Sequence, residues 1–381
     1  MRLIVLLGLV SLFSDITYEG ARGILGPYLG LLGASALAVG FVAGLGELLG
    51  YGLRLLSGWF ADKSRAHWSV AAVGYVVNLL SVPTLALTGS WHQAAVLVAL
   101  ERTGKAIRTP SRDTILSCAA SGGRRGLGFG IHEALDQIGA VIGPLAVGWV
   151  MKLGGSYRDA FALLGIPAVL ALFALWTARR SYPHAIEPEG RDALRTEKGF
   201  PKGFWLYMIP MGLIGAGFPD FALIGYHLGK TAIVPVHLIP YLYALAMGVD
   251  ALCALAFGWL FDKKGVKVMA LSAVGSALCL PLAFSHNTGL LALGVVLWGM
   301  GMGVIDSVAK AVVAELLPFE KRGTGYGIFY TAFGLSWFLG SLLLGALYKE
   351  VSAGAAALCS LGLIAASVPL LLWLKDITPR P

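Results

Sequence analysis

The sequence predicts an all-α, polytopic membrane protein with twelve transmembrane helices. Of its 381 residues, 57% are hydrophobic and 13% are charged, whereas soluble domains average about 45–50% and about 25%. Apolar runs of about twenty residues, the length that crosses a hydrocarbon layer of about 30 Å, recur along the whole chain. Each run must be helical, because lipid offers no hydrogen-bond partner to backbone N–H and C=O groups.

The expected spans alternate with short turns that contain glycine or proline. We place them at 3–29, 36–60, 68–88, 91–117, 126–151, 158–177, 203–229, 237–261, 267–286, 289–314, 324–348 and 353–375. One long polar segment, 178–202, interrupts this series. It divides the chain into an N-terminal six-helix half (1–177), a linker (178–202) and a C-terminal six-helix half (203–381).

The basic residues of the predicted loops are distributed unevenly. If the N-terminus is cytoplasmic, the outer loops carry only Lys152, Arg158, Lys230 and Lys349, and the other loop cations lie inside. By the positive-inside rule, both termini and the linker are expected on the cytoplasmic side of the cytoplasmic (inner) membrane. The net charge of +8 is then explained by topology and contact with anionic lipid, not by nucleic-acid binding.

Two short patterns occur twice, once in each half. Gly58-Trp-Phe-Ala-Asp62-Lys63 follows the second span, and Gly258-Trp-Leu-Phe-Asp262-Lys263 follows the eighth. Arg-Gly-x-Gly-x-Gly-Ile opens the fifth span at 125–131 and the eleventh at 322–328. Such internal duplication is a recurring design of secondary transporters.

The duplicated loop resembles the signature loop of the major facilitator superfamily, Gly-x-x-x-Asp-(Arg/Lys)-x-Gly, found between helices 2–3 and 8–9. The second copy fits with Gly265, whereas Arg65 stands at the corresponding position of the first. Gly139-x-x-x-Gly143-Pro-x-x-x-Gly148 on the fifth span is similar to a motif of the exporters in that superfamily, with one terminal glycine missing. Those glycines also predict close approach of a neighbouring helix.

The duplicated loops are candidates for conformational gating. A carboxylate at a membrane edge accepts from helix N-terminal amides and pairs with a nearby arginine, and we expect Arg112 to pair with Asp62. Plain cytoplasmic charge is the alternative explanation. The gating candidates are Gly58, Asp62, Lys63, Arg112, Gly258, Asp262 and Lys263.

Charged residues also lie inside the predicted spans, where each costs at least about 2.5–3.5 kcal/mol and therefore needs a partner or a task. The acids are Asp15, Glu19, Glu47, Glu101, Glu133, Asp136, Asp220, Asp250 and Asp306, and the bases are Arg22, Arg54, Arg102, Lys105 and Lys310. The acids outnumber the bases, so some carboxyl groups must be protonated, hydrated or compensated by a cation. This surplus favours a proton-driven cycle, although a structural ion pair is the alternative for each residue.

The resemblance assigns the central cavity to helices 1, 4, 7 and 10. It selects as proton-coupling residues Asp15 or Glu19, with Arg102 as modulator, and the titratable helix-5 cluster adds Glu133 and Asp136. The candidate substrate contacts are Arg22, Glu101, Lys105, Asp220, Asp306, Lys310 and Tyr330. Glycine and proline at 215–220 in the seventh span predict a broken helix, which is typical of transporter binding sites, or a simple kink.

We therefore predict a secondary active transporter that exports a small molecule in exchange for protons, of the drug- or metabolite-efflux type. Proton-coupled uptake and export of a divalent metal are the alternatives within transporters. A membrane enzyme acting on lipid-linked substrates is the alternative from another class, but no catalytic loop motif appears.

Few other features of the sequence bear on function. The four cysteines are isolated, so we expect no bound metal, no cofactor and no disulfide framework. We expect a monomer in the bilayer. Asparagine and glutamine occur only at positions 78, 287, 93 and 137, a scarcity that points to a thermophilic source.

Overall fold

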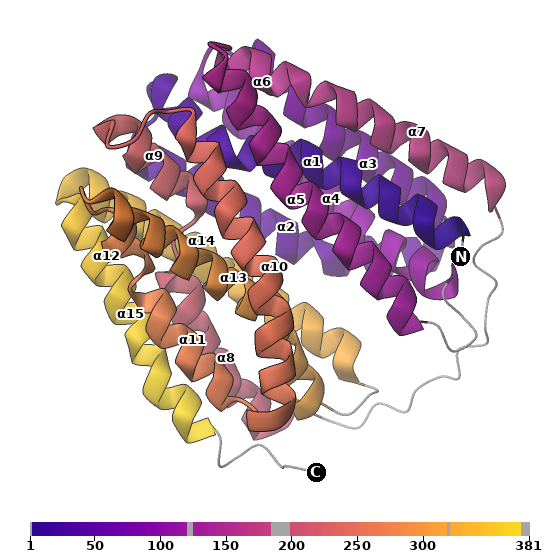
Figure 1. Cartoon of the computed structure of the whole chain (residues 1–381). Coiled ribbons are helices and arrows are strands. Elements are labelled where there is room, and N and C mark those ends of the chain that lie inside the picture. Colours follow the sequence, from indigo (N-terminus) through magenta and orange to yellow (C-terminus); the bar gives the residue numbers. More distant parts are fainter. Residues whose placement is uncertain (1, 120–124, 184–198, 318–320, 375–381) are drawn as a thin grey trace. The chain divides into compact units, whose positions relative to one another are not determined.

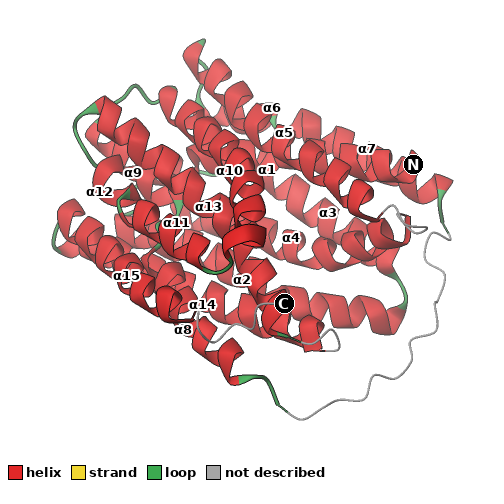
Figure 2. Cartoon of the chain, turned by 60° about the horizontal axis from the view of Figure 1, so that its bottom comes forward, coloured by secondary structure: helices red, strands yellow, loops and turns green. Residues whose placement is uncertain are grey.

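The computed structural model describes residues 2–119, 125–183, 199–317 and 321–374. All secondary structure in these ranges is helical (Figure 2), so the predicted all-α class is confirmed. The helices are α1 (Arg2–Leu31), α2 (Ala36–Ser64), α3 (His67–Thr84), α4 (Trp91–Ala119), α5 (Arg125–Lys152), α6 (Tyr157–Leu163), α7 (Gly165–Ser181), α8 (Lys202–Gly217), α9 (Phe221–Thr231), α10 (Leu238–Lys264), α11 (Lys267–Ala277), α12 (Cys279–Ala283), α13 (Thr288–Leu316), α14 (Arg322–Glu350) and α15 (Ala353–Leu374).

The described helices match the expected spans closely. Ten are long and apolar enough to cross a membrane. Two other expected spans differ in character. The segment Lys267–Ala283 is shorter, and α4 carries acidic and basic side chains along much of its length. The number twelve therefore remains a prediction, while a multi-pass membrane protein is established.

The chain divides into two compact units. One holds residues 1–33, 49–191 and 235–244, and the other holds 34–48, 192–234 and 245–381. Helices α2 and α10 thus contribute to both units. In the first unit, α1 packs along α5 and α7, and α3 packs along α4 (Figure 1). In the second, α8 packs on α14 and α15, and α11 on α13 and α15.

The contact of α1 with α5 is close because glycines stand in the interface. A Cβ atom added to Gly139 would collide with the carbonyl oxygen of Leu12. One added to Gly143 would collide with the Ile16 carbonyl oxygen and would lie 2.9 Å from the Gly20 nitrogen. Small residues permit this backbone approach, so the close packing predicted from the glycine spacing is confirmed.

The predicted break in the seventh span is present. Helix α8 ends at Gly217 and α9 begins at Phe221, with Phe218 extended between them. The freed carbonyl groups find side-chain donors: Ser360 Oγ donates to the Gly217 oxygen at 2.6 Å, and Trp298 Nε1 donates to the Pro219 oxygen at 2.7 Å. An interrupted helix is tolerated at membrane depth only when such partners exist.

The glycine packing predicts a selective effect of small substitutions. Gly143→Ala should lower the free energy of unfolding by about 1–3 kcal/mol, because the added methyl group overpacks a backbone contact. Gly248→Ala on α10 is the matched control, since nothing lies within 4 Å of an added Cβ there. Thermal unfolding of the purified variants measures the difference. Equal midpoints would contradict the close approach.

Candidate functional site

The first unit buries an acid–base cluster on α1, α4 and α5, made up of Asp15, Glu19, Arg22, Lys105, Arg108 and Asp136. Residues 15, 19 and 22 share one face of α1 because they are spaced by four and three positions. Residues 105 and 108 are likewise three apart on α4. Two of its carboxylates differ. Glu19 has several partners, whereas Asp15 has an oxygen without a hydrogen-bond partner among the described residues.

Glu19 is the carboxylate with several partners. It is 6% exposed, and its Oε1 lies 3.4 Å from Arg22 Nη1 and 3.9 Å from Lys105 Nζ. The hydroxyl group of Tyr243, on the part of α10 that belongs to the same unit, donates a hydrogen bond to Oε2. Two cations and a hydroxyl donor stabilise the ionised form of this carboxylate.

Asp15 lies one turn earlier on α1 and is 4% exposed. Its Oδ1 has no hydrogen-bond partner among the described residues. Its charged neighbours are of both signs: Lys105 and Arg108 are positive, and Glu19 and Asp136 are negative. A buried carboxylate oxygen without a partner is costly in the charged form, so this is a carboxyl group for which a proton has a structural benefit.

Two cations on α4, Lys105 and Arg108, lie against aromatic faces. Lys105 Nζ lies 3.9 Å from the centroid of the Tyr18 ring. Arg108 is 1% exposed, with its Cζ 4.5 Å from the Tyr75 centroid and 5.6 Å from that of Tyr18. Its Nε and Nη1 have no hydrogen-bond partner in the described part of the chain. Cation–π contact is worth about 2 kcal/mol when desolvated and lets the buried guanidinium do without a full set of acceptors.

Arg108 was not among the site residues predicted from the sequence. Helix α4 continues to Ala119, so Arg108 lies within the helix and is buried. The signal available was its spacing of three residues from Lys105. Tyr18, Tyr75 and Tyr243 were missed as well, because nothing in a single sequence distinguishes a tyrosine that meets a charge from one that packs in the core.

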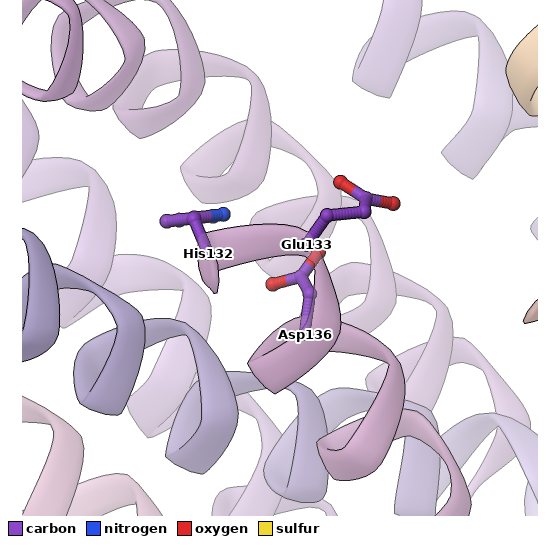
Figure 3. Close-up of side chains that lie close together, drawn as sticks. All are labelled: His132, Glu133 and Asp136. Carbon is purple, nitrogen blue, oxygen red and sulfur yellow. The ribbon is translucent and has the colours of Figure 1, made fainter. Parts of the chain in front are cut away.

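Three titratable side chains, His132, Glu133 and Asp136, lie together on α5 (Figure 3). Their potential ligand atoms lie within 4.8 Å of one another, so they form a group that could hold a cation. Ser11 Oγ, however, donates to Asp136 Oδ1, and Arg112 exerts its positive charge on both His132 and Asp136. That charge opposes a metal ion.

Glu101 and Arg102 pair with each other on α4. Arg102 Nε lies 3.1 Å from Glu101 Oε2, and Asn78 Nδ2 on α3 donates to the Glu101 backbone oxygen at 3.0 Å and to its Oε1 at 2.9 Å. Helix α3 can come this close because residue 104 is glycine, where a Cβ would collide with the Asn78 nitrogen. This part of α4 is therefore fixed by a buried ion pair and an amide.

The first gating loop shows different pairing from the one expected. Asp62 Oδ1 lies 3.8 Å from His67 Nε2, while Arg112 Nη2 lies 2.8 Å from Asp113 Oδ1. Direct pairing of Asp62 with Arg112 stays a prediction. In both loop copies the lysine stacks on the tryptophan four residues before it, with Lys63 Nζ 4.9 Å from the Trp59 centroid and Lys263 Nζ 3.6 Å from that of Trp259.

The two loops share a backbone conformation at the position where the first has Arg65 and the second has Gly265. Arg65 has φ +54° and Gly265 has φ +61°. This left-handed region suits glycine, whereas it costs an ordinary residue about 1–2 kcal/mol. The first loop therefore bears a strain that the second avoids.

The second unit holds the remaining candidates. Lys310 Nζ lies 3.9 Å from Asp306 Oδ1, and both side chains are about two-fifths exposed. Tyr326 donates from its hydroxyl to the Lys310 carbonyl oxygen at 3.0 Å and stacks on Tyr330. Asp220 instead caps α9 by accepting from the Ala222 N–H at 2.8 Å.

The aromatic side chains along α14 are only partly accessible. Phe329, Phe333 and Trp337 are 2%, 2% and 1% exposed and pack in the core of the second unit. Tyr330 is half-buried, so it is the member of this series that retains access to the surface.

The family follows from comparison with known proteins. The model of the Major Facilitator Superfamily matches residues 7–265 and 203–381, which together span nearly the whole chain. The chain belongs to the Major Facilitator Superfamily. It is therefore a membrane transporter and not an enzyme, as predicted.

The chain is also similar in sequence to bacterial proteins, and in fold to a solved transporter structure. An uncharacterised protein of Mycobacterium tuberculosis is 40% identical over 361 residues, covering 93% of this chain and 88% of the relative. The fosmidomycin resistance protein of Escherichia coli is 28% identical over 325 residues, covering 79% and 75%. The crystal structure of the nucleoside transporter NupG has a TM-score of 0.74 at 14% identity and covers 100% of both chains, which shows a shared fold.

The acid–base cluster predicts unequal consequences for stability. Glu19→Gln should lower the free energy of unfolding by about 3–5 kcal/mol, because two buried cations lose their counter-charge. Tyr243→Phe should cost about 1.5–3 kcal/mol, the value of a hydrogen bond to a charged group.

The control for both is Glu350→Gln, at an exposed pair with Lys349, which should change stability by about 0.5 kcal/mol or less. Chemical unfolding of the purified proteins gives the three values. A Glu19→Gln variant as stable as the control would show that the carboxylate is not holding the cations.

Proposed function

We propose that this transporter exports a small molecule across the cytoplasmic membrane by alternating access in exchange for protons, with Asp15 as the proton carrier. The observation that carries the proposal is the contrast between two acids on the same face of α1. Glu19 contacts Arg22, Lys105 and Tyr243, whereas Asp15 Oδ1 is buried without a hydrogen-bond partner among the described residues.

A proton carrier must gain and lose its proton during the cycle. Several fixed partners hold Glu19 in the ionised form and favour an anchoring role. Asp15 meets Lys105 and Arg108 as well as Asp136 and Glu19, so small movements of these helices change the balance of charge around it. In a low-dielectric interior such changes shift protonation strongly.

The other sequence candidates take supporting roles in this proposal. Arg102, paired with Glu101, and the α5 residues Glu133 and Asp136 modulate the charge around Asp15. Substrate contacts are assigned to Arg22 and Lys105 in the first unit and to Asp306, Lys310 and Tyr330 in the second. Asp220 contributes by its position at the break between α8 and α9.

Export as the direction has two supports. A relative that aligns over 79% of this chain is named a fosmidomycin resistance protein, and resistance through a membrane transporter is consistent with removal of the compound. The Gly139–Gly148 pattern on α5 is the second support, because it resembles the exporters of the family. Uptake uses the same architecture and is the outcome to exclude.

The proposal is tested in proteoliposomes with an imposed pH gradient and a pH-sensitive dye. Fosmidomycin, cationic drugs, sugars, amino acids and divalent metals are the compounds to screen. A transported compound should dissipate the gradient. Asp15→Asn should reduce proton-driven transport to the level of empty vesicles while preserving substrate exchange, because the amide keeps the shape of the neutral acid but releases no proton.

Glu350→Gln, an exposed acid at the end of α14, is the matched control and should behave as the unmodified protein. If no compound dissipates the gradient, or if Asp15→Asn transports against a gradient normally, proton exchange through Asp15 is wrong. A gradient-driven accumulation in the opposite direction would assign uptake.

The cytoplasmic placement of both termini is part of the same proposal. In a variant without native cysteines, Ser64→Cys should react with an impermeant maleimide only from the cytoplasmic side, and Lys152→Cys only from the outside. Both positions are exposed, and each is the last residue of a candidate span (Ala36–Ser64 and Gly130–Lys152). The two spans are expected to cross the membrane in opposite directions. Mass spectrometry of labelled spheroplasts and inverted vesicles gives the result, and reversed labelling would invert the topology.

A further inference from the structure

A polar cavity of about 370 Å³ lies in the first unit where α7 ends and α3 begins. It is lined by Arg65, His67, Trp68, Ser69, Arg179 and Pro183. None of these residues belongs to the acid–base cluster on α1, α4 and α5. Two arginines in one small cavity indicate a preference for an anion.

The start of α3 adds to that preference. The helix runs for 18 residues, and its N-cap position is held by Ala66, with no side-chain hydrogen bond to the first turn. Alanine has no side-chain oxygen to offer the first turn, unlike serine, threonine or aspartate. Such N–H groups and the helix dipole favour a negatively charged ligand.

The side chains around this helix start supply further donors. Trp68 is 8% exposed, and its indole N–H has no acceptor among the residues that the structure describes. Arg179 Nη2 lies 3.4 Å from Ser69 Oγ, which places the guanidinium group against the first turn of α3. Asp62 lies 3.8 Å from His67 Nε2, and the two arginines outweigh this single carboxylate.

The backbone strain at Arg65 also has its explanation here. Arg65 adopts φ +54° where the second loop copy uses Gly265 at φ +61°. Glycine is therefore the residue that the turn prefers. An arginine at that position brings a cationic side chain into the cavity, and a strained residue of this kind is typical of a binding site.

The surroundings indicate that the anion belongs to a lipid. Helices α3 and α7 pack along each other (Figure 1), and both are parts of candidate membrane spans that end at the cavity. Phe173 and Trp176 on α7 and Val73 on α3 are more than half exposed, which suits contact with acyl chains. Arg180 stacks over Trp176 at 5.6 Å, as expected at a membrane interface.

We propose that this cavity binds the phosphate of an anionic phospholipid headgroup, with Arg65, Arg179, the Trp68 N–H and the first turn of α3 as donors. The site does not depend on the direction or coupling of transport. Its residue His67 contacts Asp62 of the gating loop, so a bound headgroup lies next to a motif proposed to control the conformational change.

The test measures binding of a fluorescent phosphatidylglycerol to the full-length protein in phosphatidylcholine nanodiscs. Arg179→Gln should weaken binding about tenfold, the value of one charge-assisted hydrogen bond. Arg180→Gln is the matched control, since it removes the adjacent cation, which does not line the cavity. Trp68→Phe should weaken binding as well without loss of charge.

The variant Arg65→Gly distinguishes a role of Arg65 in lipid binding from a purely structural role. It should raise the midpoint of thermal unfolding, because glycine relieves the left-handed strain, and yet weaken lipid binding about tenfold. A purely structural arginine would change neither or lower both.

Three results would overturn the proposal: equal loss in Arg179→Gln and Arg180→Gln, equal affinity for labelled phosphatidylcholine, or unchanged binding in Arg65→Gly. Competition with inorganic phosphate at millimolar concentration tests whether the cavity binds a soluble anion instead of a lipid. Its failure to displace the lipid supports the headgroup assignment, and full displacement would reassign the cavity to a free anion.

Discussion

Charge cannot be left uncompensated in the apolar interior of a helical membrane protein, and this constraint organises the first unit. Lys105 and Arg108 rest on tyrosine faces, and Glu19 collects two cations and a hydroxyl donor. Asp15 keeps a buried carboxylate oxygen without a hydrogen-bond partner among the described residues. A carboxyl group that is costly when charged and surrounded by movable charges is suited to exchange a proton.

Close helix packing is what brings these charges together. Gly139 and Gly143 allow α5 to approach the backbone of α1, and Gly74 and Gly104 do the same between α3 and α4, where a Cβ on Gly74 would lie 2.6 Å from the Arg108 nitrogen. Larger residues would separate the helices, removing the tyrosine faces from the cations and the Ser11 hydroxyl group from Asp136. The glycines therefore determine the electrostatics as well as the packing.

The two repeated loops share a backbone conformation but differ in the side chain at the left-handed position. Both copies place a lysine over a tryptophan, and both turn through a left-handed residue. The first copy uses the less favourable Arg65 there, next to a cavity with a second arginine. The second copy uses Gly265 and avoids the strain. In the proposed headgroup site, Arg65 thus marks a position where ligand binding outweighs conformational preference.

The sequence alone was sufficient to predict the membrane class, the positions of the helices, the break near Pro219, the glycine contact of α5 and the family. These properties follow from local hydropathy, spacing and motifs, which the chain carries in order. The sequence could not separate Asp15 from Glu19, because both have the right spacing on α1, and it did not single out Arg108. The contact of Glu19 with Tyr243 and the position of Arg108 between Tyr18 and Tyr75 depend on helix packing. They could not be predicted, because these partners come from helices that are distant in the chain.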